Sequence, residues 1–281
     1  MIIIADAGSS KTDWACVRGQ VCIAQWQSPG INPLTMSSDY IRSVIHQACS
    51  IYQSHTELTE LNFYGAGCNL EGKEIITGIL HEFFAKCKLN VDSDLLASVR
   101  CFDTSDEMIV AILGTGSNAC LSNGHEILMG IRGLGFILGD FASGSDLGKR
   151  LIQNYFCGVL ESDLTVSLEQ EFPELKQSFI AEFYSSGTKA AMLANYAKFV
   201  INYKHEKALQ ELILHALHDF QYFYVRQLER NKKYKIGFTG SIAFHLQEEI
   251  KSCFCSLGYA EPYFVRQPIE SLIKYHIRHH Q

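Results

Sequence analysis

The first residues that could do chemistry lie near the amino terminus, where a short apolar stretch runs into a polar octet. Ile2 to Ile4 predict a buried strand, and the octet reads Asp6-Ala7-Gly8-Ser9-Ser10-Lys11-Thr12-Asp13. Glycine lets consecutive backbone N–H groups converge on an anion, while the hydroxyls and the lysine add donors suited to phosphate. Carboxylate oxygens are ligands that Mg²⁺ prefers, so Asp6 is a candidate metal ligand. A plain hairpin turn is the alternative, because glycine and serine are common turn residues.

The chain repeats this arrangement further along. The apolar run 108–113 leads into Gly114-Thr115-Gly116-Ser117-Asn118, and a short apolar segment and a tight turn follow, as they do after the first octet. Two strand–turn–strand units of this kind predict two related lobes facing one nucleotide. Neither unit matches the Walker pattern, and no Gly-x-Gly-x-x-Gly fingerprint opens a helix after a strand.

The segments that must position these turns alternate between strand and helix patterns, which predicts the α/β class with mixed sheets. Strands are expected at 2–5, 13–18, 21–27, 61–64, 89–92 and 234–238, with a second meander over 108–131. Helices are expected at 38–54, at 71–87, from Asp94, after Thr239-Gly240-Ser241, and from 269 to the end, with a mostly helical stretch over 143–232 that is broken near Pro173 and Gly187. Within that stretch, apolar residues from Leu209 to Tyr224 keep helical spacing, which predicts core rather than a ligand site.

Composition narrows the class of protein. The chain has 281 residues, 47% hydrophobic and 19% charged, which is ordinary for a globular protein and long enough for one large or two medium domains. A formal net charge of −6 argues against a nucleic-acid partner. The sequence shows neither a leader pattern nor a run able to span a bilayer, so we expect a cytoplasmic protein without a membrane partner.

The cysteines and histidines are candidate metal ligands. None of the ten cysteines has Cys-x-x-Cys spacing, which favours buried, reduced thiols over metal binding. For His276, His279 and His280 we expect an exposed tail rather than a metal site.

In their order, these motifs resemble the BadF/BadG/BcrA/BcrD ATPase family, which includes N-acetylglucosamine kinases and belongs to the sugar kinase, Hsp70 and actin superfamily. The resemblance covers nearly the whole chain and includes the stretches 133–140, 143–150 and 268–276. It implies two ribonuclease-H-like (actin-like ATPase) lobes with an interlobe cleft for nucleotide and sugar. The implied domains are 1–104, which binds sugar and phosphate, and 105–268, which binds nucleotide and carries a helical insertion. Residues 269–281 form a C-terminal helix for which the resemblance allows a return to the first lobe.

The resemblance also implies an ATP-dependent kinase that phosphorylates an amino sugar, N-acetylglucosamine or a close relative, with ATP and Mg²⁺ as cofactors and a homodimer as an allowed assembly. Asp6 would bind the Mg²⁺ ion. The implied substrate residues are Asn32, Thr115, Gly135 and Asp140, although an Asx-turn before Pro33 equally explains Asn32. The implied nucleotide-binding residues are Gly8, Ser9, Ser10, Lys11, Thr12, Gly114, Thr115, Gly116, Ser117, Gly240 and Ser241.

Such a kinase needs a carboxylate that deprotonates the attacking hydroxyl. In these kinases it ends a strand and opens a helix shortly before the second phosphate turn, which Asp94 does in this sequence. Asp103 is the alternative, but it sits in a polar linker where a turn or a helix cap explains it.

The chain departs from the family pattern at several positions. In the first turn, Ala7 and Ser9 stand where glycines are common. Phe141 and Ala142 stand where many relatives have glutamate and glycine, and Leu134 stands where mammalian-type N-acetylglucosamine kinases have tryptophan. These departures keep a non-catalytic sugar or nucleotide sensor open as an alternative. An electron-transfer ATPase that activates acyl-CoA dehydratases is a second alternative, with Cys68 and Cys101 as candidate cluster ligands.

Overall fold

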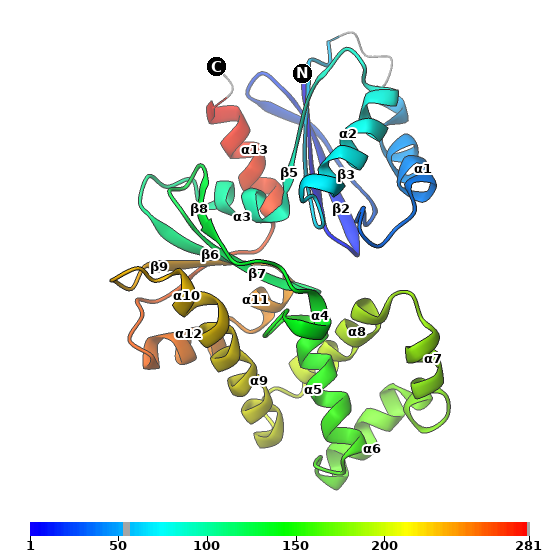
Figure 1. Ribbon diagram of the computed structural model, residues 1–281, viewed down its shortest axis with the longest axis vertical. Coiled ribbons are helices and arrows are strands. Elements are labelled where there is room, and N and C mark those ends of the chain that lie inside the picture. Colours follow the sequence, from blue (N-terminus) through cyan, green and yellow to red (C-terminus); the bar gives the residue numbers. More distant parts are fainter. Residues whose placement is uncertain (53–56, 280–281) are drawn as a thin grey trace. The chain divides into compact units, whose positions relative to one another are not determined.

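The computed structural model describes residues 1–52 and 57–279, drawn as a ribbon in Figure 1. The chain forms two compact units. The first comprises Met1–Val110, Ser122–Leu128 and Val265–Gln281, and the second comprises Ala111–Leu121 and Met129–Phe264. The predicted α/β class is confirmed, because each of the two five-stranded sheets is accompanied by helices.

The sheet of the first unit has the order β3-β2-β1-β4-β5. Strands β1 and β2 are antiparallel, as are β2 and β3, whereas β4 runs parallel to β1 and β5 runs parallel to β4. Their bounds are Ile2–Ala7 (β1), Lys11–Arg18 (β2), Val21–Pro29 (β3), Glu60–Gly65 (β4) and Lys88–Ser93 (β5). The helices of this unit are Ser38–Cys49 (α1), Leu70–Phe83 (α2), Asp94–Phe102 (α3) and Pro268–His279 (α13).

Alternation along β1 gives the first unit a core on each face of its sheet, since successive side chains of a strand point to opposite faces. Ile3 and Ala5 join one buried cluster with residues of α1 and α2. Ile2 and Ile4 join a second cluster with α3 and α13, whose contributions include Ala97 and Leu272. Helix α13 therefore packs against α3, β1 and β2.

The second sheet has the order β10-β9-β6-β7-β8. Its strands are Met108–Leu113 (β6), Ser117–Ser122 (β7), Ile127–Gly130 (β8), Lys235–Thr239 (β9) and Tyr263–Val265 (β10). The helices of the second unit are Gly135–Leu138 (α4), Gly144–Phe156 (α5), Ser162–Glu171 (α6), Phe179–Ser185 (α7), Lys189–Asn202 (α8), Lys207–Phe220 (α9), Arg226–Leu228 (α10), Ser241–His245 (α11) and Gln247–Ser256 (α12). Helix α5 lies tightly on α8, because a Cβ at Gly148 would lie 1.9 Å from the carbonyl oxygen of Leu193.

The expected elements are present with shifted ends. The helix expected at 38–54 ends at Cys49 and continues as the 3₁₀ turn Ser50–Tyr52, and residues 53 and 54 lie outside the described residues. The stretch 143–232 divides into separate helices, with a 3₁₀ turn at Pro173–Lys176 and a π-helix at Gln221–Val225. That π-helix alters the spacing of the apolar stripe, so Tyr224 is buried while Phe223 is 47% exposed.

All ten cysteines are free, and six of them are buried. No helix among residues 1–52 and 57–279 is long and apolar enough to cross a membrane. The expectation of an exposed tail is confirmed for His279 but wrong for His276, which is buried because α13 turns it toward the sheet. The His276 Nε2 lies 2.8 Å from the hydroxyl oxygen of Tyr64 on β4. His280 lies outside the described residues.

Candidate active site

The first polar octet forms the turn between β1 and β2. The Gly8 N–H donates to the carbonyl of Lys11 at 2.9 Å, and the carbonyl of Gly8 accepts from the Ile31 N–H at 3.1 Å. The loop after β3 therefore lies directly on this turn. A Cβ at Gly30 would lie 2.4 Å from the carbonyl carbon and oxygen of Ser9, so only glycine fits there without a shift of backbone.

The donors of this turn point in different directions. Ser10 and Lys11 are exposed and Ser9 is half-buried. The Lys11 Nζ pairs with an Asp13 carboxylate oxygen at 2.8 Å. Thr12 is fully buried, and its hydroxyl donates to the carbonyl of Pro29 at 3.2 Å. Of the predicted phosphate donors in this octet, Thr12 is thus the one whose side chain joins β2 to β3 instead of facing outward.

Three carboxylates gather beside this turn, from β1, β2 and the start of α3. Asp6 and Asp13 are register partners in the antiparallel pairing of β1 and β2. Asp94 is the first residue of α3, and the preceding Ser93 caps the helix by accepting the Leu96 N–H at 3.2 Å. Sequence reasoning found Asp6 and Asp94 but not Asp13, whose place opposite Asp6 follows from the two residues being equally far from the hairpin turn.

The negative charges of Asp6, Asp13 and Asp94 repel one another. Burial raises the pKa of Asp6 to about 7, and the charges of Asp94 and Asp13 add to the increase, while Lys11 opposes it. A divalent cation would offset the same repulsion. The donor set consists of carboxylate oxygens, which Mg²⁺ takes, so these residues fit the metal that a phosphotransfer site needs.

Asn32 lies beside the first turn and uses both ends of its amide. Its Nδ2 donates to the Ser9 hydroxyl at 3.1 Å, and its Oδ1 accepts the Leu34 N–H at 3.0 Å, the geometry of an Asx-turn. A Cβ at Gly67, whose φ is +77°, would lie 2.3 Å from the same Oδ1. Asn32 therefore holds the Gly30–Leu34 loop, the first turn and the Gly65–Gly67 turn together.

The second glycine-rich turn, in the second unit, is held by backbone hydrogen bonds, as the first turn is. The Gly114 N–H donates to the carbonyl of Gly116 at 2.9 Å, and the carbonyls of Gly114 and Thr115 accept from the first N–H groups of α5, those of Gly144 and Ser145, at 2.8 and 3.1 Å. These two helix N–H groups are thereby already used by the turn.

The third glycine motif lies against the second. A Cβ at Gly240, whose φ is +98°, would lie 2.3 Å from the carbonyl oxygen of Leu113 and 3.2 Å from the Gly114 nitrogen. Ser241 follows as the exposed first residue of α11. The structure thus brings Gly114 and Gly240 together, although 126 positions separate their residue numbers, 114 and 240.

Asp140 faces the second turn. Its Oδ1 accepts the Ser117 N–H at 3.2 Å, its backbone has a φ of +54°, and its own N–H donates to the Tyr224 hydroxyl at 3.0 Å. Burial is the main reason that the pKa of Asp140 is raised. Ser117 is buried, and its hydroxyl donates to the Phe141 carbonyl at 2.7 Å, which places it beneath Asp140 as a support. Sequence reasoning missed Tyr224 because its helical spacing indicated only core.

Gly135, a predicted sugar contact, and Phe141, a departure from the family pattern, lie near Asp140 in the sequence. Gly135 is exposed with a φ of +68° at the start of α4, and its carbonyl accepts the Gly139 N–H at 2.8 Å, one residue before Asp140. Phe141, the departure from the family pattern, stacks on Phe223 with ring centroids 4.7 Å apart and meets Tyr224 edge-on at 5.5 Å. Where many relatives have a glutamate, this chain thus has an aromatic ring that packs onto the π-helix.

Asp103, the alternative to Asp94, lies at the opposite end of α3. It ends the helix in a left-handed conformation, forms an ion pair with Arg278 and is hydrogen-bonded to His279, both of α13. A helix rises about 1.5 Å per residue, so the two carboxylates stand at well-separated ends of α3. The structure groups Asp94, not Asp103, with Asp6.

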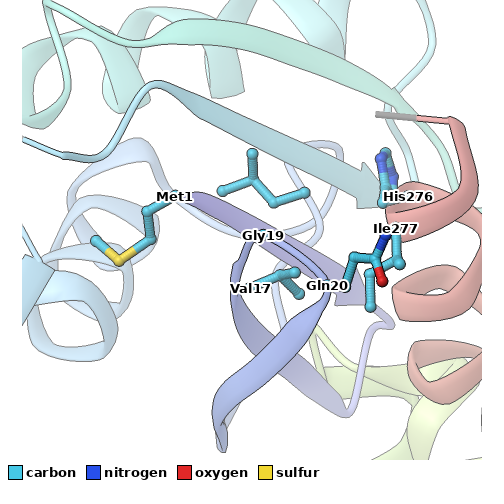
Figure 2. A pocket seen from close by; sticks show the side chains of 7 residues that line it. Met1, Val17, Gly19, Gln20, His276 and Ile277 are labelled. Atoms are coloured by element: carbon cyan, nitrogen blue, oxygen red, sulfur yellow. The ribbon is translucent and has the colours of Figure 1, made fainter. Parts of the chain in front are cut away.

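A small pocket of about 150 Å³ lies elsewhere on the first unit and is shown in Figure 2. It is lined at the amino end of β1 by Met1, Ile2, Val17, Gly19, Gln20, His276 and Ile277. Asp6 lies four residues further along the same strand, or about 13 Å at the rise of an extended strand. The pocket is therefore separate from the carboxylate group.

The two-sheet α/β architecture is shared with solved structures of sugar kinases of actin-like ATPase fold. Among solved structures, a Porphyromonas gingivalis protein described as a "putative N-acetylglucosamine kinase" is 31% identical, with a TM-score of 0.91 and 100% of both chains covered. The chain belongs to the family of that protein.

More distant structures share the fold. A Chromobacterium violaceum protein with the same description is 17% identical, with a TM-score of 0.73 and 98% of both chains covered. A ROK family glucokinase from Streptomyces griseus, in complex with glucose and AMPPNP, is 11% identical, with a TM-score of 0.56 and 98% of this chain and 97% of that chain covered. No family model matches the sequence, and no curated protein does.

Proposed function

We propose that the protein is an ATP-dependent kinase that phosphorylates a hydroxyl group of an amino sugar, with N-acetylglucosamine or a close relative as substrate. The observation that carries the proposal is the grouping of Asp94, at the start of α3, with Asp6 beside the first glycine turn. The family relationship to the Porphyromonas gingivalis protein supports the amino sugar as acceptor. The order of the motifs supports membership of the BadF/BadG/BcrA/BcrD group.

In this proposal Asp94 is the general base. Its carboxylate takes the proton of the sugar hydroxyl while the hydroxyl oxygen bonds to the γ-phosphorus and the bond from that phosphorus to the β–γ bridging oxygen breaks, so that ADP leaves. A positioned base of this kind accelerates a reaction by about 10²–10⁴-fold. Asp6, with Asp13 beside it, would hold Mg²⁺, which when bound neutralises charge on the phosphates.

The remaining residues divide between phosphate and sugar. Backbone N–H groups of the two glycine turns, together with Ser9, Ser10 and Lys11, would contact the phosphates, and Gly240 with Ser241 would face the adenosine. Asn32, Thr115, Gly135 and Asp140 would contact the sugar, with Tyr224 holding the backbone of Asp140. Thr12, which is also predicted to bind nucleotide, stabilises the pairing of β2 and β3 through its hydroxyl.

The burial of the candidate cluster ligands weakens the electron-transfer alternative. Cys68 and Cys101 are both buried. Burial raises the pKa of the Cys68 thiol to about 12 and that of Cys101 well above its ordinary value. Iron–sulfur clusters are held by thiolates, which such surroundings disfavour.

The test is the release of ADP from Mg·ATP across N-acetylglucosamine, N-acetylmuramic acid, glucosamine, N-acetylmannosamine and glucose. We expect sugar-dependent ADP with one clear preference, abolished in Asp94→Asn and retained in Asp103→Asn. Full activity in Asp94→Asn would overturn the assignment of the base while leaving the kinase intact. Binding of ATP and sugar without turnover would replace the kinase by a sensor.

A further inference from the structure

Three residues far apart in the sequence place potential metal ligands together on the first unit. They are Asp103 at the end of α3, His125 in the turn between β7 and β8, and His279 at the end of α13. One ligand atom from each, a carboxylate oxygen or a ring nitrogen, lies within 4.8 Å of the others. The His279 Nε2 and the Asp103 Oδ1 are 3.1 Å apart. From this juxtaposition we propose that these three side chains bind a divalent transition metal ion, Zn²⁺.

The backbone that carries His125 is held in place by contacts that do not involve the other two side chains. The Ser122–Leu128 segment is fixed on the residue after Asp103, because a Cβ at Gly124 would lie 1.5 Å from the Thr104 carbonyl oxygen. Asn123 Oδ1 accepts the N–H groups of His125 and Glu126 at 3.1 and 2.8 Å, which shapes the backbone that carries the imidazole. Sites built on supported side chains bind metal more readily than sites left to loose loops.

The surroundings of the ligands match those of a metal site. Arg278 pairs with the Oδ2 of Asp103, which leaves Oδ1 on the side of His279. A carboxylate whose second oxygen is held by a neighbour is oriented in the way that supports metal ligands. The rings of His125 and His279 stand edge to face with centroids 5.3 Å apart, and Tyr275 packs against both.

The ligand set selects the class of metal. Two imidazoles with one carboxylate suit Zn²⁺ and its neighbours, whereas Mg²⁺ takes oxygen ligands almost exclusively. Ligand atoms around a tetrahedral Zn²⁺ lie about 3.3 Å apart. The three ligand atoms here lie within 4.8 Å of one another, so small side-chain rotations bring them to that spacing. A bound ion joins the ends of α3 and α13 to the Ser122–Leu128 turn. This inference is independent of the proposed kinase activity.

The test is a titration of the full chain with Zn²⁺ by calorimetry, in the presence of excess Mg²⁺, and with Co²⁺ followed by its visible absorption. Cys157 and Cys255 are exposed thiols that also bind these metals, so the titrations use a Cys157→Ser/Cys255→Ser background. The variants are His125→Ala and His279→Ala. The matched control is His81→Ala, an exposed histidine of α2 outside the group.

We expect one Zn²⁺ per chain and a tetrahedral Co²⁺ spectrum. Affinity should fall at least tenfold in His125→Ala and in His279→Ala, and stay unchanged in His81→Ala. Saturating Zn²⁺ should also slow amide hydrogen exchange in α13, because the ion holds the end of that helix. Equal affinity in all variants, or no stoichiometric binding, would overturn the site. Should one variant fold poorly, the other still decides the question.

Discussion

Asp6 on β1 and Asp94 at the start of α3 lie close enough for the charge of Asp94 to raise the pKa of Asp6. The two residues belong to elements that pack on each other in the first unit: β1 in its sheet and α3 on one face of that sheet. The repulsion between their carboxylates destabilises the folded chain, and it is located beside the first glycine turn. Such placement is typical of sites that handle charged substrates and metals.

This repulsion predicts a pH dependence of stability in protein freed of divalent metal with EDTA. The pKa of Asp6 is about 7 in the folded chain and 3.8 as its ordinary value, so the folded chain binds the proton more tightly. The resulting stabilisation is complete below pH 3.8 and is lost as the pH rises through about 7. One pKa unit is about 1.4 kcal/mol, so the effect is on the order of a few kcal/mol.

Melting temperature measured against pH, for the parent and for Asp6→Asn, checks this prediction. The parent should lose stability relative to the variant across the window from pH 3.8 to about 7. Mg²⁺ should return part of that loss in the parent and none in Asp6→Asn. Parallel curves for the two proteins would show that Asp6 does not carry the effect.

Gly30→Ala should damage the first turn. The added Cβ would lie 2.4 Å from the Ser9 backbone, and backbone cannot move aside cheaply. We expect a loss of several kcal/mol in the free energy of unfolding, in the range of severe single substitutions. Gly78→Ala is the matched control, because its Cβ would meet no atom within 4 Å and it lies inside α2, where alanine stabilises by about 0.5–1 kcal/mol. Urea unfolding of both variants measures the contrast, and equal stability would refute the close approach.

Asn32→Ala and Ser9→Ala separate two roles of Asn32. Both substitutions remove the hydrogen bond between these side chains. Were ordering of the turn the whole role of Asn32, both would raise KM for ATP alike. Because we propose that Asn32 also contacts the sugar, Asn32→Ala should raise KM for the sugar about tenfold or more, the equivalent of about 1.4 kcal/mol, while Ser9→Ala leaves it near the parent value. Steady-state kinetics with each substrate varied in turn makes the distinction.

Tyr224→Phe should loosen Asp140. The substitution removes the hydroxyl that accepts the Asp140 N–H and leaves the ring packed against Phe141. We expect the free energy of unfolding to fall by about 0.5–1.5 kcal/mol and KM for the sugar to rise. Tyr222→Phe, at a residue that is 52% exposed, is the control for loss of a tyrosine hydroxyl on the same π-helix. An unchanged KM in Tyr224→Phe would mean that Asp140 does not rely on this support.

Local patterns were sufficient for much of the fold. Apolar alternation and turn residues located the strands on both sides of each glycine turn, and the cap Ser93 with Asp94 located the start of α3. These features depend on neighbours in the sequence. The roles given to the individual site residues stay predictions.

Features that depend on distant residues were not predictable. The contact between the Tyr224 hydroxyl and the backbone of Asp140 joins residues that are 84 positions apart. The burial of His276 required Tyr64, 212 residues earlier. Periodicity predicted a helix at the carboxyl end, but it carried no information about which surface that helix would cover.

Helix α13 has a consequence for the order in which the protein is made. Leu272 and Ile273 share a buried cluster with Ile2 and Ile4, so the second core of the first unit contains residues from both ends of the described chain. The ribosome synthesises β1 through α3 long before it reaches Pro268. During that interval α3 alone covers this face of the nascent sheet, and the apolar surface that α13 will bury stays exposed to chaperones. Messages cut short before Pro268 would therefore yield a first unit that aggregates or is degraded.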